Sequence, residues 1–204
     1  MTNKFPLIKS IALILQIIWY LQLIFISALI IISLLIAIDS PIVEQYKLKG
    51  FSVQFHQIDL SSQQNDKPVY ISNGIGRLHN TNAEKKFIFY RIFSVFTDAL
   101  LYTFIVFWLR KILNVSEADA LFTKKNGEYI TKIAYAVLGI ALLPAIINYY
   151  INLEVVQHLK IEHITFKARL NIDFRTLFLA MLIFIIAKVF VKGAELKEEN
   201  DLTI

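Results

Sequence analysis

Polar residues divide the chain into four long apolar stretches. No charged residue occurs between Ser10 and Ile38, a run longer than the apolar part of a signal peptide and long enough to cross a bilayer as a helix. The last stretch contains Lys188, whose ammonium can reach the interface by snorkelling. Thr123 is a suitable N-cap for a helix that leads into the third stretch. The pattern predicts transmembrane helices over residues 9–38, 88–112, 131–153 and 174–192.

Charged residues near the apolar stretches indicate an orientation. Lys4 and Lys9 precede the first stretch, whereas Asp39 and Glu44 follow it, and basic residues favour the cytoplasmic side. Both termini are therefore expected in the cytoplasm. No repeat or linker marks a second domain, so residues 1–204 are expected to form one membrane domain. Its other parts are outer loops 39–87 and 154–173, a cytoplasmic loop 113–130 and a cytoplasmic tail 193–204.

A strand-like alternation of apolar and polar residues occurs in the two outer loops. It is clearest over residues 163–172 and recurs over residues 51–56 and 69–71, the last just before the tight-turn pair Asn73-Gly74. Both loops lie on the same side, so their strands can pair. The predicted fold is therefore an all-α membrane protein, a four-transmembrane-helix bundle, with a small extracytoplasmic antiparallel β layer formed by the two outer loops.

Composition supports a membrane location and excludes several kinds of site. The 204 residues are 56% hydrophobic and 18% charged, so apolar side chains have to face lipid. The absence of cysteine excludes disulfides and thiolate chemistry. A net charge of +5 suits a lipid bilayer with anionic headgroups. The basic residues are spread over every loop, which is atypical of direct nucleic-acid binding.

Asp98 is the main candidate for intramembrane chemistry, because carboxylates inside a bilayer are costly and usually face other helices. Arg91, Ser94, Asp98 and Tyr102 follow one another at helical spacing on one face. The third span should bring Asn148 to a similar depth, and Arg175 enters the fourth from the same side. The predicted intramembrane polar cluster is either a ligand- or proton-responsive pocket or an interhelical hydrogen bond that holds the bundle together. Its members are Asp98, Arg91, Ser94, Tyr102, Asn148 and Arg175.

The four histidines all occur in the predicted outer loops. None has the helical spacing of a preformed ligand pair, so they are interpreted as solvated polar residues. The sequence therefore predicts neither a metal site nor a cofactor. The histidines are His56, His79, His158 and His163.

Two stretches carry a resemblance to a known family. One is Leu121-Phe122-Thr123 with Asn126, Ile130 and Ile133, and the other is the C-terminal string from Gly193 to Ile204. Together with four spans, they resemble the bacterial membrane family catalogued as domain of unknown function 2975, over essentially the whole chain except the variable outer loop. The resemblance implies a four-pass protein of the bacterial inner (plasma) membrane with both termini inside. It also implies a neighbouring gene for a helix-turn-helix regulator of the Cro repressor type, and no assigned catalytic residues.

Two functions are compatible with these observations. The first is a non-enzymatic regulatory or signalling module that interacts with a cytoplasmic transcriptional regulator through its tail. The alternative is a small transporter or channel subunit that uses Asp98 and acts as a homo-oligomer. An enzyme is not expected, since no catalytic set lies at a common depth. The tail is otherwise interpreted as solvated, and its candidate partner-binding residues are Glu195, Leu196, Glu198, Glu199, Asn200 and Asp201.

Overall fold

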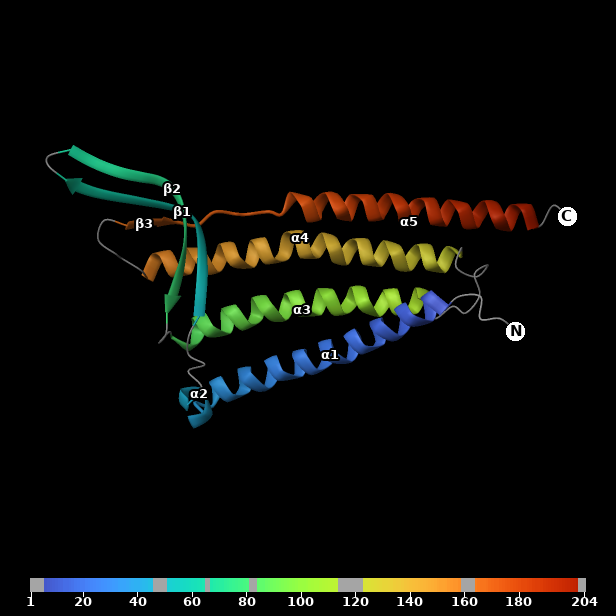
Figure 1. Cartoon of the computed structure of the whole chain (residues 1–204), viewed down its shortest axis with the longest axis horizontal. Coiled ribbons are helices and arrows are strands. Elements are labelled where there is room, and N and C mark those ends of the chain that lie inside the picture. Colours follow the sequence, from blue (N-terminus) through green and yellow to red (C-terminus); the bar gives the residue numbers. More distant parts are fainter. Residues whose placement is uncertain are drawn as a thin grey trace. The chain divides into compact units, whose positions relative to one another are not determined.

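Four long helices dominate the part of the chain that the structure describes (Figure 1). The computed structural model describes residues 6–45, 51–64, 67–80, 84–113, 123–158 and 164–201. Each of the four helices is long and apolar enough to cross a membrane, which confirms the four spans expected from the sequence. They are α1 (Pro6–Ala37), α3 (Lys85–Leu113), α4 (Lys124–His158) and α5 (Phe174–Asp201), and a short α2 (Pro41–Gln45) follows α1.

Two of these helices extend well beyond the predicted spans. Helix α4 begins at Lys124 because Thr123 caps it, its Oγ1 accepting a hydrogen bond from the backbone N–H of Asn126 at 3.2 Å. The N-cap prediction for Thr123 is therefore confirmed. Helix α5 does not end near residue 192 but continues to Asp201, so most of the predicted tail is helical. The ion pair between Lys192 Nζ and Glu195 Oε2, which lie 3.1 Å apart one turn along the helix, supports this extension.

Helix α1 ends in a Schellman motif. The N–H of Ser40 donates to the carbonyl of Leu35, and the N–H of Asp39 donates to that of Ile36. Asp39 occupies the left-handed position with a φ of 49°, a conformation that aspartate tolerates better than most residues. Its carboxylate also forms an exposed ion pair with Lys85 at the start of α3.

The two loops that were predicted to lie outside contribute three antiparallel strands in the order β2-β1-β3. They are β1 (Phe51–Gln64), β2 (Lys67–Asn80) and β3 (Ile164–Lys167). Strand β1 pairs with β2 over its whole length, and its central part pairs with β3, so segments of the two loops pair as the alternation predicts.

Two details of the predicted strands are wrong. The pair Asn73-Gly74 lies inside β2, where Gly74 is opposite Ile58 at a register shift, and it forms no tight turn. Glycine suits such an irregularity because it has no side chain to pack. The strand predicted over 163–172 is a strand only over Ile164–Lys167, since the following residues connect to α5; residue 163 lies outside the described residues.

The chain packs as two compact units, and α1, α3 and α4 contribute to both. Unit 1 consists of Met1–Ser27, Asp98–Leu142 and Asp173–Ile204, and unit 2 of Ala28–Thr97 and Leu143–Ile172. The core of unit 2 brings the end of α1 and helix α2 against the start of α3 and the end of α4. Its buried members are Ile36, Val43, Phe87, Ile88, Ile151 and Val155. That all 204 residues form a single membrane domain stays a prediction.

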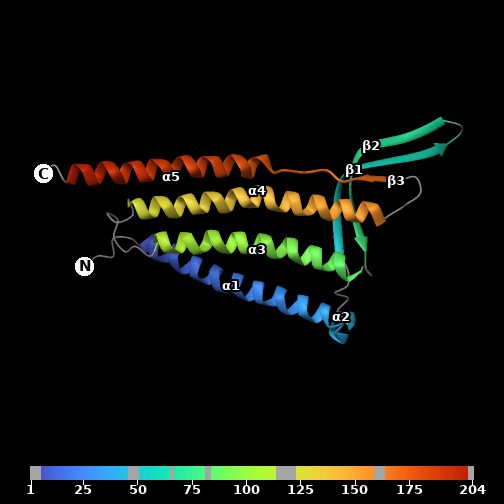
Figure 2. The ribbon, with the colours of Figure 1, turned by 180° about the vertical axis from the view of Figure 1, so that it is seen from behind.

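Small residues are buried on α4 and α5 in unit 1, where the two helices run side by side in opposite directions (Figures 1 and 2) and Gly127 approaches Val191. A seven-residue spacing returns to nearly the same helix face after two turns. On each helix three such positions are buried, and this lets the backbones approach closely, as small residues do in membranes. The positions are Gly127, Ala134 and Ala141 on α4, and Ala180, Ala187 and Ala194 on α5.

Candidate functional site

Two members of the predicted intramembrane polar cluster meet in unit 2. Ser94 on α3 is 2% exposed, and its hydroxyl donates a long hydrogen bond of 3.5 Å to Oδ1 of Asn148 on α4. This contact agrees with the expected common depth of the two residues. At 3.5 Å the contact is longer than a normal O–H···O hydrogen bond, so it links the two helices only weakly.

The other members of the cluster have different surroundings. Asp98 is half-buried and belongs to unit 1, as do Tyr102 and Arg175. The side chains of Arg91, Tyr102 and Arg175 are exposed, and that of Tyr102 is 52% accessible. A common pocket around Asp98 therefore stays a prediction, whereas the interhelical bond has a counterpart in Ser94 and Asn148.

A charged and aromatic network, not predicted as a site, joins the start of α3 to the end of α4. Lys86 Nζ donates to Glu154 Oε1 at 3.2 Å and lies 3.4 Å from His158 Nε2. The ring of His158 meets Phe87 edge-on at 5.9 Å between centroids, and Lys86 lies 4.9 Å from the centre of the same phenyl ring. The available signal was the presence of Lys86 and Glu154 at the same predicted side of the membrane, next to two spans.

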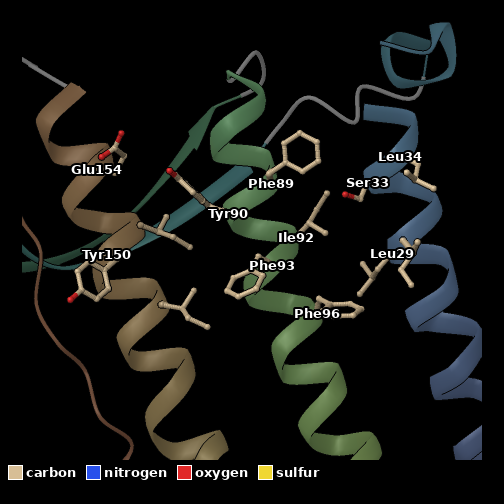
Figure 3. A pocket seen from close by; sticks show the side chains of 13 residues that line it. Leu29, Ser33, Leu34, Phe89, Tyr90, Ile92, Phe93, Phe96, Tyr150 and Glu154 are labelled. Atoms are coloured by element: carbon tan, nitrogen blue, oxygen red, sulfur yellow. The ribbon is translucent and has the colours of Figure 1, made fainter. Parts of the chain in front are cut away.

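An apolar pocket of about 860 Å³ opens beside this network in unit 2 (Figure 3). Phe89, Ile92 and Phe96 of α3 point toward α1, while Phe93 and Tyr90 point toward α4. Glu154 contributes a carboxylate to the lining, so the pocket has apolar walls and one ion-paired edge. Its lining residues are Leu29, Ile30, Ser33, Leu34, Phe89, Tyr90, Ile92, Phe93, Phe96, Ile147, Tyr150, Ile151 and Glu154.

Chemically, this pocket suits an acyl chain or another apolar group better than it suits catalysis. Its volume lies in the range of small-molecule pockets, and its few polar groups are a serine, two tyrosines and the paired Glu154. The described residues contain no group of three His, Asp or Glu side chains that could hold a metal ion. His79 and His158 are exposed, and the side chains of His56 and His163 lie outside the described part.

The C-terminal part of α5 presents a different surface. Leu196 is 55% exposed among charged residues, and Glu195 is held by Lys192. Leu196, Lys197, Glu199 and Asn200 outline a shallow, open depression. Glu198 is exposed as well, whereas the side chain of Asp201 lies outside the described part. Leu196 is thus an exposed apolar residue on an otherwise charged and polar helix end.

At its other end, α5 begins with an exposed aspartate cap. Asp173 Oδ1 accepts from the backbone N–H of Arg175 at 3.0 Å, and Oδ2 accepts from the hydroxyl of Thr176 at 2.7 Å. The hydrogen bond from Thr176, followed by those from the helix backbone, lowers the pKa of Asp173 below its usual value.

The four apolar helices define the chain as a multi-pass membrane protein. The family described as "Protein of unknown function (DUF2975)" matches residues 74–204, and the chain belongs to this family. The match begins inside β2, so it covers residues 74–80 of β2 and the last three long helices, but not α1 or β1. No curated protein and no solved structure matches the chain.

Proposed function

We propose that this protein is a non-enzymatic regulatory module of the bacterial inner membrane that binds a cytoplasmic regulator on the C-terminal part of α5. Both termini then lie in the cytoplasm, and the three-stranded sheet lies outside it. The regulator proposed is a small helix-turn-helix transcription factor, as the family resemblance suggests.

The observation that carries the proposal is the continuity of α5 from the span to Asp201. At about 1.5 Å per residue, the segment from Lys192 to Asp201 adds about 14 Å of helix beyond the apolar part. A helix that is already formed loses less conformational entropy on binding than a disordered tail would. The segment can therefore present its side chains in a fixed arrangement.

Charge and hydrophobicity suggest the kind of partner. Exposed Leu196 offers an apolar anchor, and Glu198 and Glu199 lie close to it in the sequence. A DNA-binding regulator has a basic surface, which attracts acidic segments and steers their association. Binding to the membrane-anchored helix would withhold such a surface from DNA.

Crosslinking in cells tests this proposal. Cells that express the tagged full chain are crosslinked, the membrane protein is solubilised, and bound proteins are identified by mass spectrometry. The full chain is expected to retain a DNA-binding protein that is lost from Leu196→Glu and from a chain truncated after Lys192. The control Glu84→Gln removes an exposed carboxylate at the start of α3 and should retain it. Identical recovery from all four chains would refute the proposal.

The alternative function, a small transporter or channel subunit, depends on Asp98. Asp98 is half-buried within α3, which is compatible with either a structural or a transporting carboxylate. Asp98→Asn should abolish ion flux in reconstituted vesicles under the alternative, and should leave partner capture intact under the proposal made here.

A further inference from the structure

A second cluster of charged and aromatic side chains lies in unit 1, where α3 ends and α4 begins. Lys132 Nζ lies 4.2 Å from the centre of the Trp108 ring, and Lys111 Nζ lies 5.2 Å from it. Both ammonium groups also lie within 6 Å of the Tyr129 ring, at 5.7 and 5.9 Å. The guanidinium carbon of Arg110 lies 5.2 Å from the ring of Trp19. The basic aromatic cluster consists of Trp19, Trp108, Arg110, Lys111, Tyr129 and Lys132.

The cations of this cluster lack an acidic partner within the described part of the chain. No carboxylate there lies within ion-pair distance of Arg110, Lys111 or Lys132. Glu128 precedes Lys132 by four residues, an arrangement that favours a helical ion pair, yet the ammonium of Lys132 lies against Trp108 instead. Two like charges beside one pair of rings repel each other, and an anion placed between them would remove that repulsion.

Sequence position places these cations at the depth of lipid headgroups. Arg110 and Lys111 lie in the last turn of α3, where the helix dipole favours positive charge, and the helix ends at Leu113. Tryptophan and tyrosine concentrate at the boundary between hydrocarbon and water. The anions most abundant at that depth are the phosphates of lipids. In a cation–π contact, the N–H groups of a lysine that point away from the ring can still donate to phosphate oxygens.

We propose that the basic aromatic cluster binds the phosphodiester headgroup of an anionic phospholipid. Lys111 and Lys132 donate hydrogen bonds to the phosphate, and Trp108 and Tyr129 hold the two ammonium groups in place. Arg110, against Trp19, adds positive potential from the neighbouring position on α3. The proposal is independent of the protein contact on α5, because the two involve different residues.

The two tryptophans of the chain both belong to this cluster, so tryptophan fluorescence reports directly on the site. The full chain is placed in nanodiscs with increasing fractions of brominated phosphatidylglycerol or brominated phosphatidylcholine, which quench nearby indoles. We expect a clear preference for the anionic lipid, of about fivefold for each participating lysine, that weakens at high ionic strength. Lys111→Gln/Lys132→Gln should abolish the preference.

The matched control is Lys124→Gln/Lys125→Gln, which removes the same charge from exposed lysines in the first turn of α4. This control should keep the preference, and quenching by phosphatidylcholine should be equal in all three chains if the tryptophans stay at the interface. Equal quenching of the wild-type chain by both lipids would overturn the proposal. So would equal loss of preference in both double variants, which would indicate a general effect of net charge. Suppression of the preference by millimolar inorganic phosphate, at constant ionic strength, would assign the site to free phosphate instead.

Discussion

The closest approach between α4 and α5 gives the sharpest test of the packing in unit 1. A Cβ atom at Gly127 would lie 2.5 Å from Cγ2 of Val191, 3.2 Å from its backbone nitrogen and 3.4 Å from its Cα. A valine side chain has little rotational freedom in a helix, so it cannot easily move away. Gly127→Ala should therefore force the two helices apart.

The magnitude follows from two opposing effects. Overpacking of this kind costs about 1–3 kcal/mol. Replacing glycine by alanine favours the helix by at most about 1 kcal/mol, and by less in a membrane mimetic, where the denatured chain keeps much of its helix. With the full helix gain subtracted, Gly127→Ala should therefore destabilise the protein by roughly 0–2 kcal/mol, and by up to about 3 kcal/mol where that gain is small.

A double-mutant cycle with Val191→Ala separates this contact from other effects. Removal of Cγ2 leaves only the two longer backbone contacts, so Gly127→Ala should cost clearly less in the Val191→Ala background. Gly193→Ala is the matched control, because a Cβ there meets nothing within 4 Å. Unfolding free energies are measured by denaturant titration in mixed micelles. Equal effects of Gly127→Ala with and without Val191, or an equal effect of Gly193→Ala, would refute the reasoning.

Three further predictions concern the ends of the helices. Asp39→Gly should stabilise the protein by up to about 1 kcal/mol in the same titration, since glycine adopts the left-handed conformation without strain. The exposed ion pair with Lys85, which is lost, contributes little. A clear loss of stability would show that the ion pair dominates. Asp173 has a lowered pKa in the folded protein, so its stabilising effect is present above its usual value of 3.8 and is lost as the pH falls through the folded value. Asp173→Ala should therefore accelerate amide exchange in the first turn of α5 at neutral pH, and this difference should vanish in acid; a difference that does not change with pH would contradict the cap. Glu154→Gln and Lys86→Met should each lower the thermal midpoint, because each breaks the hydrogen bond between the two side chains. The midpoint of the double variant should be no lower than that of the worse single variant. A lower midpoint would show that the two residues act independently.

The number of spans could be predicted because it depends only on the length and hydrophobicity of each run. Strand pairing between the first and last loops could be predicted because alternation with period two is a local signal. The turn predicted at Asn73-Gly74 is wrong because a local turn signal does not decide how a whole hairpin pairs. A favourable turn pair competes with the register of a whole hairpin, and here Gly74 is used at an irregularity inside β2. The bounds of the last span did not give the end of α5, since the charged residues after Lys192 end the apolar run but can continue the helix.

The buried faces of the helices are a harder problem in a membrane than in water. A span that is apolar on every side has no hydrophobic stripe to show which face meets its neighbours. Polar residues gave a partial answer, and Ser94 and Asn148 do meet. The informative signal was instead the seven-residue spacing of small residues, as in Ala180 and Ala187, because lipid has no preference for small side chains whereas a closely packed helix requires them. The basic aromatic cluster was likewise not visible in the sequence. Lys132 and Trp108 are far apart in the sequence, and only the packing of α4 beside α3 places one against the other.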